Sequence, residues 1–453
     1  MKSDGNVPVA IVGGGFSGTM LAAQLARRGI ASRLIEGGGR AGLGTAFSTP
    51  EPAHLLNVRA EAMSAWPEVP DDFARRSGDP RGFAERREFG RYLHDILDEA
   101  VGSGHVEIIA SKALNAVAHG KQWQVELADG SAIVADALVL AIGNQPPEPL
   151  AASADAGPRL VNNPWSEEAA AAIAEAAASG GDVLLIGTGL TMIDAVLSLE
   201  AAGHEGRIVA LSRRGQVPRA HADFAAAPVA LCDVPQGDLH TLWRWLRRRS
   251  GEVGWRAAVD ALRPHSQALW QALPADQQRR FLRHARPWWD VHRHRIAPQV
   301  ARQIAERVAA GRLEIVAGRI VGLRATADGV EVVIRRRSSP LSPLGFAESR
   351  SPASGERQHF AFAFNCTGPL GAIGRTRDAL LRGLLERGVV RADTHGVGLE
   401  VDERSRAAEG LWALGPLTKG RYWEIVAVPD IRLQAAAVAD DIAGALSAAA
   451  TDR

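Results

Sequence analysis

The sequence predicts an α/β fold with two Rossmann-like dinucleotide-binding domains, the first of them discontinuous, and a helical insertion. Three observations support this class. A strand, a glycine turn, a helix and a second strand open the chain, the same plan begins again near residue 181, and later apolar strands end in glycine. Open α/β folds bind their ligands at the carboxyl ends of parallel strands, where such glycines lie.

The opening unit covers residues 9–36, VAIVGGGFSGTMLAAQLARRGIASRLIE. Gly13 permits a tight turn, Gly15 lets a pyrophosphate approach the backbone, and Gly18 lets helix and strand pack closely. The helix presents N–H groups and the positive end of its dipole to the phosphates. Glu36 stands 18 residues beyond the last glycine, where a carboxylate accepts hydrogen bonds from ribose hydroxyls. An acid there permits NAD or FAD. The alternative is a glycine-rich turn in another α/β protein.

Composition narrows the classes of function. The 453 residues suffice for two or three domains, and a net charge of +1 gives no electrostatic reason to expect a nucleic-acid or membrane partner. Cys232 and Cys366 are too few for a disulfide framework and are typical of a reducing cytosol. No apolar run reaches the ~18–20 residues of a membrane span, and the start MKSDGNVP lacks the pattern of a signal peptide. We therefore expect a soluble, cytoplasmic protein.

A long loop rich in glycine and proline follows the opening unit, and its apolar and aromatic residues predict that it is ordered. Beyond the loop, the pattern predicts a helix over 86–101, short strands over 106–110, 113–119, 122–127 and 131–134, and a buried strand over 137–142 that ends in Gly143. The small residues 151–158 are typical of a linker.

The second unit has its glycine turn at Gly187 and Gly189, followed by a predicted helix and by a strand that ends at Arg213 and Arg214. Met192 replaces the third glycine, which loosens the packing of helix on strand and leaves the phosphate turn intact. Arginines at this strand end can clamp a 2′-phosphate, which favours NADPH. Two alternatives stay open, namely an ordinary βαβ crossover with solvated arginines, and the use of NADH.

Residues 238–311 predict a helical insertion, because their apolar residues recur at helical spacing. The run 287–298, PWWDVHRHRIAP, joins aromatic and cationic side chains, among them Arg293, that suit a small anion or the NADPH phosphate. His292 and His294 are only two residues apart and lack a Cys or acidic cluster in metal spacing, so we expect no metal.

The last third of the chain returns to strands. Strands are predicted over 313–316, 320–325, 329–336, 359–366 and 411–414, a low-complexity loop over 338–355, and a closing helix over 429–446. Gly368 and Gly415 follow two of these strands. We expect residues 1–160 and 357–453 to form the two parts of an FAD-binding domain, with an NAD(P)-binding domain over 181–336 between them.

Two nucleotide units in one chain suggest electron transfer between a flavin and a nicotinamide. Several stretches also resemble the two-dinucleotide-binding flavoproteins, and within them the bacterial FAD/NAD(P)-binding group of FAD-dependent urate hydroxylases and aspartate N-hydroxylases. The stretches are VAIVGGGFSGTMLAAQLARRG, GLGTAFSTPEPAHLLNVRAEAMSAWP, LLIGTGLTMIDAVLSL, LSRRGQVPRAH, WWDVHRHRIAP, NCTGP and LGPLTKGRYWEI.

The resemblance implies site residues. Gly13, Gly15, Gly18 and Glu36 would bind FAD, residues 54–58 would line its isoalloxazine with Asn57 as a polar contact, and Gly415 would lie beside the flavin. Gly187, Gly189, Arg213 and Arg214 would bind NAD(P)H, and Gly143 and Gly368 mark two further strand ends. Candidate catalytic side chains are His54, Arg219, Arg293, Trp423 and Glu424, each with a packing or solvated-charge interpretation as its alternative.

The resemblance also implies a flavin monooxygenase that uses FAD, NAD(P)H and O₂. We expect urate, hydroxylated to 5-hydroxyisourate, as the substrate, with N-hydroxylation of an amino acid such as aspartate as the alternative. A disulfide reductase is disfavoured because the two cysteines form no C-x-x-C pair. The region RLVNNPWSEEA lacks the Phe-x-Gly and histidine typical of ketone-oxygenating relatives. An NAD(P)H-dependent flavin reductase and a nucleotide-binding sensor remain open.

Overall fold

The computed structural model describes residues 6–150, 157–336 and 355–451, so most of the predicted linker and low-complexity loop lies outside the described residues. The chain divides into two compact units. The first comprises residues 1–145, 224–285 and 370–453, and the second comprises residues 146–223 and 286–369. No helix of the described ranges is long and apolar enough to cross a membrane.

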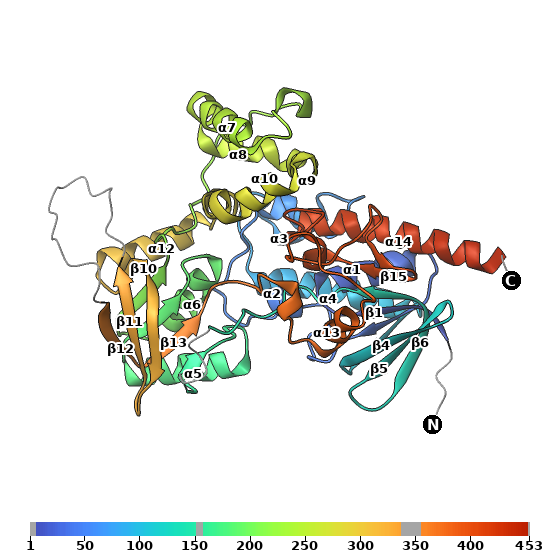
Figure 1. Ribbon diagram of the computed structural model, residues 1–453, viewed down its shortest axis with the longest axis horizontal. Coiled ribbons are helices and arrows are strands. Elements are labelled where there is room, and N and C mark those ends of the chain that lie inside the picture. Colours follow the sequence, from blue (N-terminus) through green and yellow to red (C-terminus); the bar gives the residue numbers. More distant parts are fainter. Residues whose placement is uncertain (1–5, 151–156, 337–354, 452–453) are drawn as a thin grey trace. The chain divides into compact units, whose positions relative to one another are not determined.

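The first unit is built on an eight-stranded sheet with strand order β14-β15-β6-β1-β2-β3, and β4 and β5 extend it from β6 (Figure 1). Its strands are β1 (Val7–Val12), β2 (Ser32–Ile35), β3 (Val106–Ile109), β4 (Ala113–His119), β5 (Gln122–Leu127), β6 (Ala132–Leu140), β14 (Arg406–Ala408) and β15 (Leu411–Ala413). Strands β15, β6, β1, β2 and β3 run parallel, so their carboxyl ends share one edge. Two short strands predicted over 131–142 form the single strand β6.

Alternating side chains of β1 build a core on each face of this sheet. Val9 and Ile11 face a cluster made with helices α1 (Phe16–Arg27), α4 (Arg86–Gly102) and α14 (Val428–Thr451). Ala10 and Val12 face the cluster formed with the β4–β5 hairpin and with α13 (Ala379–Glu386). The loop expected to be ordered contains two short helices, α2 (Gly44–Phe47) and α3 (Asp72–Ser77).

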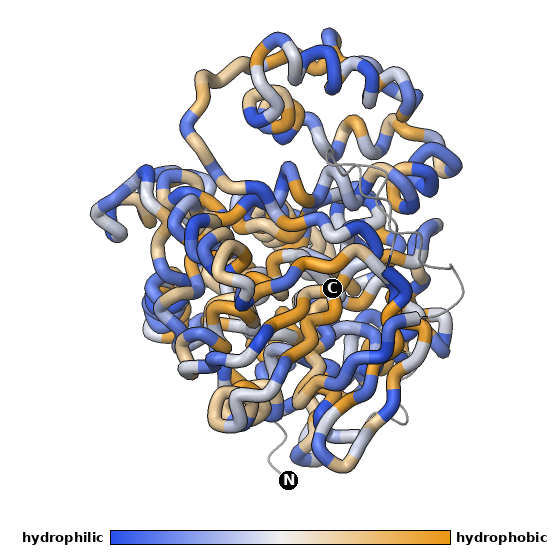
Figure 2. The backbone as a smooth tube through the Cα atoms, turned by 90° about the vertical axis from the view of Figure 1, so that its left-hand side faces the viewer, coloured by the Kyte–Doolittle hydropathy of each residue, from blue (hydrophilic) through white to orange (hydrophobic). Residues whose placement is uncertain are grey.

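Residues 224–285 form a helical segment of the first unit. It contains α7 (Leu239–Val253), α8 (Trp255–Leu262), α9 (Ser266–Ala272), α10 (Ala275–Arg280) and a π-helical turn over Phe281–Ala285. Both hydrophilic and hydrophobic residues occur along the helical segment (Figure 2). Trp270 joins the segment to the C-terminal part of the unit, because its Nε1 donates to the Gly420 carbonyl at 2.8 Å. The sequence led us to expect a helical insertion over residues 238–311 in the NAD(P)-binding domain, whereas residues 224–285 group with the first unit. Helical spacing reveals the apolar face of a helix but not the domain against which that face packs.

The second unit has a seven-stranded sheet with order β12-β11-β10-β9-β8-β13-β7. Its strands are β7 (Leu160–Val161), β8 (Val183–Ile186), β9 (Ile208–Ser212), β10 (Leu313–Ala325), β11 (Val330–Arg336), β12 (Glu356–Phe360) and β13 (Phe362–Asn365), and its helices are α5 (Glu167–Ser179), α6 (Leu190–Ala201), α11 (Arg286–Arg293) and α12 (Pro298–Ala309). Strand β13 lies beside β8, with Phe362 paired to Val183. Residues 357–369 therefore group with the second unit, whereas the sequence placed them with the FAD-binding part.

Candidate functional site

The first glycine turn, between β1 and α1, leaves no room for side chains at two positions. Gly13 has φ +106°, and a Cβ there would lie 2.5 Å from the Ala141 carbonyl oxygen. A Cβ on Gly18 would lie 1.9 Å from the Gly13 carbonyl oxygen. Glycine is thus required at both positions by the close approach of β1, β6 and α1.

The two helices that follow the glycine turns begin without a side-chain cap. The N-cap residues of α1 and α6 are Gly15 and Gly189, and neither helix receives a side-chain capping hydrogen bond. Three helices elsewhere in the described residues receive one, from Ser166, Asp238 and Asp378, and others such as α4 and α12 do not, so the glycine turns and not the missing caps set α1 and α6 apart. Backbone N–H groups at such an end suit an anionic ligand, and the helix dipole adds to the attraction. Both helix starts therefore fit the phosphates of a dinucleotide.

Glu36 follows β2 and fastens the loop around the first turn. Its Oε2 accepts a hydrogen bond from the Gly14 N–H, and its Oε1 accepts one from the Gly38 N–H, both at 2.8 Å. The Gly42 N–H in turn donates to the Gly14 carbonyl at 2.9 Å. A carboxylate offers about four acceptor positions, so two backbone bonds leave room for ribose hydroxyls.

The segment containing His54 and Asn57 lies beside the start of α4. A bridge pairs Leu55 with Glu85, and the Arg86 N–H donates to the His54 carbonyl. His54 is buried, and its Nδ1 lies 2.8 Å from Thr49 Oγ1. Asn57 is half-buried. The structure fixes this segment within the first unit, and its predicted contact with the isoalloxazine stays a prediction.

Three glycine-containing strand ends meet in the first unit, because β15, β6 and β1 are neighbours in the sheet. They lead to Gly415, Gly143 and Gly13. Gly143 has φ +67°, and a Cβ there would meet nothing within 4 Å. Gly415 has φ +65°, and its Cβ would lie 2.6 Å from the Oγ of Ser17 on α1. The sheet edge that the sequence predicted for the flavin is therefore built from N-terminal and C-terminal segments of the chain.

The second glycine turn repeats this geometry in the second unit. Gly187 has φ +124°, and a Cβ there would lie 2.2 Å from the Cys366 carbonyl oxygen, at the end of the neighbouring strand β13. Gly368 follows with φ +89° and open space around its Cα. Met192, in place of a third glycine, is fully buried. The substituted turn thus keeps the close approach at its first glycine.

Arg213 and Arg214 follow β9, the strand next to β8. Arg213 is exposed and Arg214 is half-buried. The next residues run back to the glycine turn, where the Thr188 hydroxyl donates to the Gln216 carbonyl and its Oγ1 lies 2.8 Å from the Ser212 hydroxyl. The arginines therefore stand at the sheet edge at which a 2′-phosphate is bound in this fold.

Two motifs about 70 residues apart in sequence come together beyond these arginines. The Arg219 N–H donates to the Val291 carbonyl at 2.9 Å, and the Ile296 N–H donates to the Arg219 carbonyl at 3.0 Å. Arg219 itself is exposed, whereas Arg293, between the two partners, is 8% exposed. The two segments that carry the predicted cationic residues therefore lie side by side.

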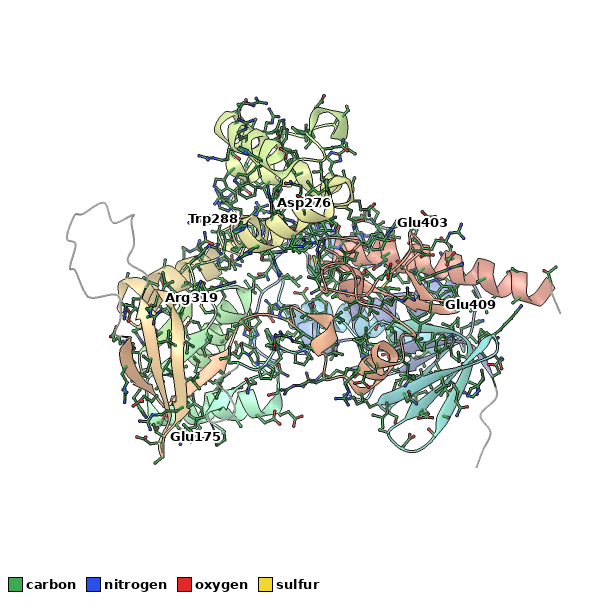
Figure 3. The ribbon with its side chains drawn as sticks, viewed as in Figure 1. Glu175, Asp276, Trp288, Arg319, Glu403 and Glu409 are labelled. Atoms are coloured by element: carbon green, nitrogen blue, oxygen red, sulfur yellow. The ribbon has the colours of Figure 1, made fainter. Side chains whose placement is uncertain are left out.

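The aromatic part of the run 287–298 is divided between surface and core. Trp288, which is labelled in Figure 3, is 47% exposed, and Trp289 is buried. The imidazole of His292 is hydrogen-bonded to its own helix, since its Nδ1 lies 2.7 Å from the Trp288 carbonyl oxygen. No group of three or more His, Cys, Asp or Glu side chains that can hold a metal occurs within residues 6–150, 157–336 and 355–451.

Trp423 belongs to an aromatic cluster of the first unit. Its ring stacks on Trp270 with centroids 4.8 Å apart and meets Phe281 edge-on at 5.4 Å. This contact supports the packing interpretation of Trp423 over a catalytic one. Glu424 is 8% exposed and has φ +70°, an uncommon backbone conformation for a residue other than glycine.

The two cysteines are free thiols that belong to different units. Cys232 is exposed. Cys366 is buried, and burial, with a smaller contribution from the Asp194 carboxylate, raises the pKa of its thiol well above the ordinary range. A buried thiol of high pKa is a poor nucleophile.

One polar residue beside the Gly415 turn was not among the residues predicted from the sequence. Gln434 lies on α14, is 8% exposed, and its Oε1 accepts a hydrogen bond from the Gly415 N–H at 2.8 Å. The signal in the sequence is a lone glutamine in the apolar stretch RLQAAAVA, which is easily taken for a surface position.

Comparison with known proteins adds to this geometry. Residues 10–145 match the model of a family described as FAD-NAD(P)-binding. The match covers the first glycine turn and β1 to β6, and it confirms FAD and NAD(P)H as the cofactors of this fold. No curated protein matches the chain.

Solved structures match over almost the whole chain. The ornithine hydroxylase of Pseudomonas aeruginosa has 16% identity, covers 98% of this chain and 100% of its own, and has a TM-score of 0.64. The ornithine N-hydroxylase of Kutzneria sp. 744 has 15% identity, with 97% and 99% covered and a TM-score of 0.62. The bacillithiol disulfide reductase of Staphylococcus aureus has 12% identity, with 97% and 98% covered and a TM-score of 0.56. These likenesses confirm the predicted fold, which hydroxylases and reductases share.

Proposed function

We propose that the protein is an FAD-dependent monooxygenase that consumes NAD(P)H and O₂. The observation that carries this proposal is the pair of glycine turns, each at a strand end of its own parallel sheet and each followed by a helix without a side-chain cap. Two dinucleotide sites on one chain suit the transfer of a hydride equivalent from a nicotinamide to a flavin. The predicted FAD site lies in the first unit and the predicted NAD(P)H site in the second.

The proposed reaction balances as NAD(P)H + H⁺ + O₂ + R–H giving NAD(P)⁺ + H₂O + R–OH. Bound FAD supplies the two-electron chemistry with O₂. Gly15 and the first residues of α1 would bring backbone N–H groups to its pyrophosphate, Gly13 and Gly18 would keep the turn close to the sheet, and Glu36 would accept from its ribose. Arg213 and Arg214 hold the 2′-phosphate of NADPH, which makes NADPH the preferred donor.

For the substrate, we favour the amino group of an amino acid, oxidised from R–NH₂ to R–NHOH. Two of the solved structures with the same fold are described as ornithine hydroxylases. Arg219 and Arg293, on adjacent segments of the second unit, supply cationic groups that suit a carboxylate. Urate hydroxylation at C5 remains the second candidate, and it is supported by the resemblance of sequence motifs alone.

A disulfide reductase shares the fold, so the cysteines distinguish the two classes. Such an enzyme passes electrons through a pair of thiols, whereas Cys366 is buried with a raised pKa and Cys232 belongs to the other unit. The double variant Cys232→Ser/Cys366→Ala is expected to keep its NADPH oxidation rate within about twofold. Loss of most of that rate would favour a thiol mechanism.

The experiment that tests the proposal measures NADPH loss, O₂ uptake and peroxide release by the FAD-loaded protein with a panel of substrates. The panel contains acidic, basic and neutral amino acids together with urate. We expect one class to stimulate NADPH oxidation, with hydroxylated product formed in step and little peroxide. Rapid oxidation with artificial acceptors and no hydroxylated product from any member would replace the monooxygenase by a flavin reductase.

A further inference from the structure

A buried polar cluster lies behind the last strand of the first unit. Its centre is Gln434, which projects from α14 in the stretch that also supplies the core residues Ile431, Ala435 and Val438. Glutamine is rarely buried to this extent, since an amide removed from water is costly unless each polar atom is bonded. The partners of this side chain therefore show what its burial achieves.

Both polar atoms of the Gln434 amide are bonded, and they converge on one turn. The Oε1 accepts from the Gly415 N–H at 2.8 Å, while Nε2 donates to Ser405 Oγ and Thr418 Oγ1, each at 3.0 Å. The Thr418 hydroxyl donates to the Gly415 carbonyl at 2.9 Å. The N–H and the C=O of Gly415 are thus both held by side chains of a single network.

The network also contains a residue in an uncommon backbone conformation. Ser405 has φ +65°, and it is 2% exposed. Its N–H donates to the Asp402 carbonyl at 3.1 Å, and its carbonyl accepts from the Ala413 N–H at 2.9 Å. A left-handed serine persists only where its surroundings determine it, and such positions cluster at functional sites. Here the conformation aims the hydroxyl at Gln434.

The turn that this network holds faces the glycine turn of the predicted FAD site. A Cβ on Gly415 would lie 2.6 Å from the Oγ of Ser17, in the first turn of α1. That helix begins at Gly15, where the FAD pyrophosphate is expected. A shift of the Gly415 turn would therefore change the shape of the cofactor site.

We propose that Gln434 is a positioning residue for the flavin. Its amide fixes the Gly415–Thr418 turn against α1, and the fixed turn sets the affinity and the spectroscopic environment of FAD. The inference rests on the proposed function only in requiring that the first unit binds FAD. It makes no use of the substrate or of O₂.

The test compares Gln434→Met with Gln24→Met. Gln24 serves as a control for the loss of a buried amide, because it lies on α1, is 2% exposed and accepts a hydrogen bond from Arg28 Nη1, while its Nε2 has no partner among the described residues and it takes no part in the Gly415 network. Both variants remove a buried amide, and Gln434→Met, which loses three hydrogen bonds against one for Gln24→Met, is expected to lower the melting temperature of the apoprotein more. Only Gln434→Met is expected to raise the FAD dissociation constant at least tenfold and to shift the flavin absorption bands.

Gln434→Glu keeps an acceptor for the Gly415 N–H but loses the two donated hydrogen bonds and places a carboxylate in a buried site, so we expect its FAD affinity to lie between those of Gln434→Met and the wild type. Thr418→Val and Ser405→Ala retain Gln434 and weaken the same network, so they should raise the FAD dissociation constant in the same direction if Gln434→Met fails to fold. Unchanged FAD affinity and spectra in all these variants would show that Gln434 is only structural and would overturn the inference.

The same measurements separate this inference from the proposed function. A wild-type protein that binds no FAD would overturn both. A wild-type protein that binds FAD, responds to Gln434→Met as described and hydroxylates no substrate would leave the positioning role standing and remove the monooxygenase.

Discussion

The two glycine turns of the chain solve the same steric problem with one difference. At the first glycine of each turn, a Cβ would collide with the carbonyl oxygen that follows the neighbouring strand, Ala141 beside Gly13 and Cys366 beside Gly187. At the third position, Gly18 touches the Gly13 carbonyl, while the second turn carries the buried Met192. Both units therefore share the close contact of the first glycine with the neighbouring strand. Only the first unit also has a close contact between its helix and the glycine turn.

The two units also differ in the charge that follows the second strand. Glu36 in the first unit bonds the Gly14 and Gly38 N–H groups, and Arg213 and Arg214 occupy the corresponding place in the second. A carboxylate suits ribose hydroxyls and repels a 2′-phosphate, whereas arginine attracts it. The proposed function therefore assigns FAD to the first turn and NADPH to the second.

The largest expected effect breaks the contact that only the first turn has. Gly18→Ala forces a Cβ into the Gly13 carbonyl, so we expect loss of bound FAD and destabilisation of about 3 kcal/mol or more. Gly444→Ala is the matched control, because this helical glycine on α14 has nothing within 4 Å of its Cβ. Thermal unfolding and flavin content measure both. Wild-type FAD content in Gly18→Ala would contradict the described packing.

A second pair of variants separates the two sites without disturbing the fold. A Cβ on Gly15 would make only ordinary contact, 3.6 Å from the Gly44 Cα, and a Cβ on Gly189 would meet nothing within 4 Å. Gly15→Ala should therefore weaken FAD binding and Gly189→Ala should weaken NADPH binding, each by roughly 10- to 100-fold, because the methyl group takes space needed by phosphate. Titration of each nucleotide into each variant measures this. Equal loss of both nucleotides in either variant would refute two independent sites.

The charge difference predicts a change of nicotinamide preference. Arg213→Ala/Arg214→Ala should raise the KM for NADPH roughly 10- to 100-fold, because the 2′-phosphate loses charge-assisted hydrogen bonds. The KM for NADH, which lacks that phosphate, should change less than threefold and serves as the internal control. If both KM values rose together, the arginines would act on a group that the two nucleotides share.

The smallest expected effect is on the pH dependence of stability, and it arises at the C-terminal end of α6, the helix that follows the second glycine turn. His204 follows α6, is 2% exposed, and burial, assisted by Arg312 and Arg307, lowers the pKa of its imidazole. The folded state thus favours the neutral ring, so its contribution to stability is complete above the ordinary histidine pKa of about 6.5 and is lost as the pH falls below it. His204→Gln should flatten the dependence of the melting temperature on pH between about 7 and 5. An unchanged pH dependence would show that His204 remains neutral in both states or is irrelevant.

Local patterns in the sequence were enough to predict the two glycine turns, the strand ends and the α/β class, because each depends on residues close together in the chain. Contacts between distant segments were not predictable in this way. The sequence makes Trp423 a catalytic candidate, whereas the structure stacks its ring on Trp270, a residue more than 150 positions away. The hydrogen bond between the Arg219 and Val291 backbones likewise joins two motifs that are far apart in the sequence. The role of Gln434 depends on a turn 19 residues away, and the polar character of glutamine gives no hint that it is buried.

In the proposed function, NADPH bound to the second unit passes electrons to FAD bound to the first unit. The most direct test is an anaerobic titration of the FAD-loaded protein with NADPH, followed by the absorption of the flavin. The account predicts that one equivalent of NADPH per chain reduces the flavin, and that Gly189→Ala needs a higher NADPH concentration for the same reduction. A flavin that stays oxidised with excess NADPH and with excess NADH would contradict the account and leave a protein that only binds nucleotides.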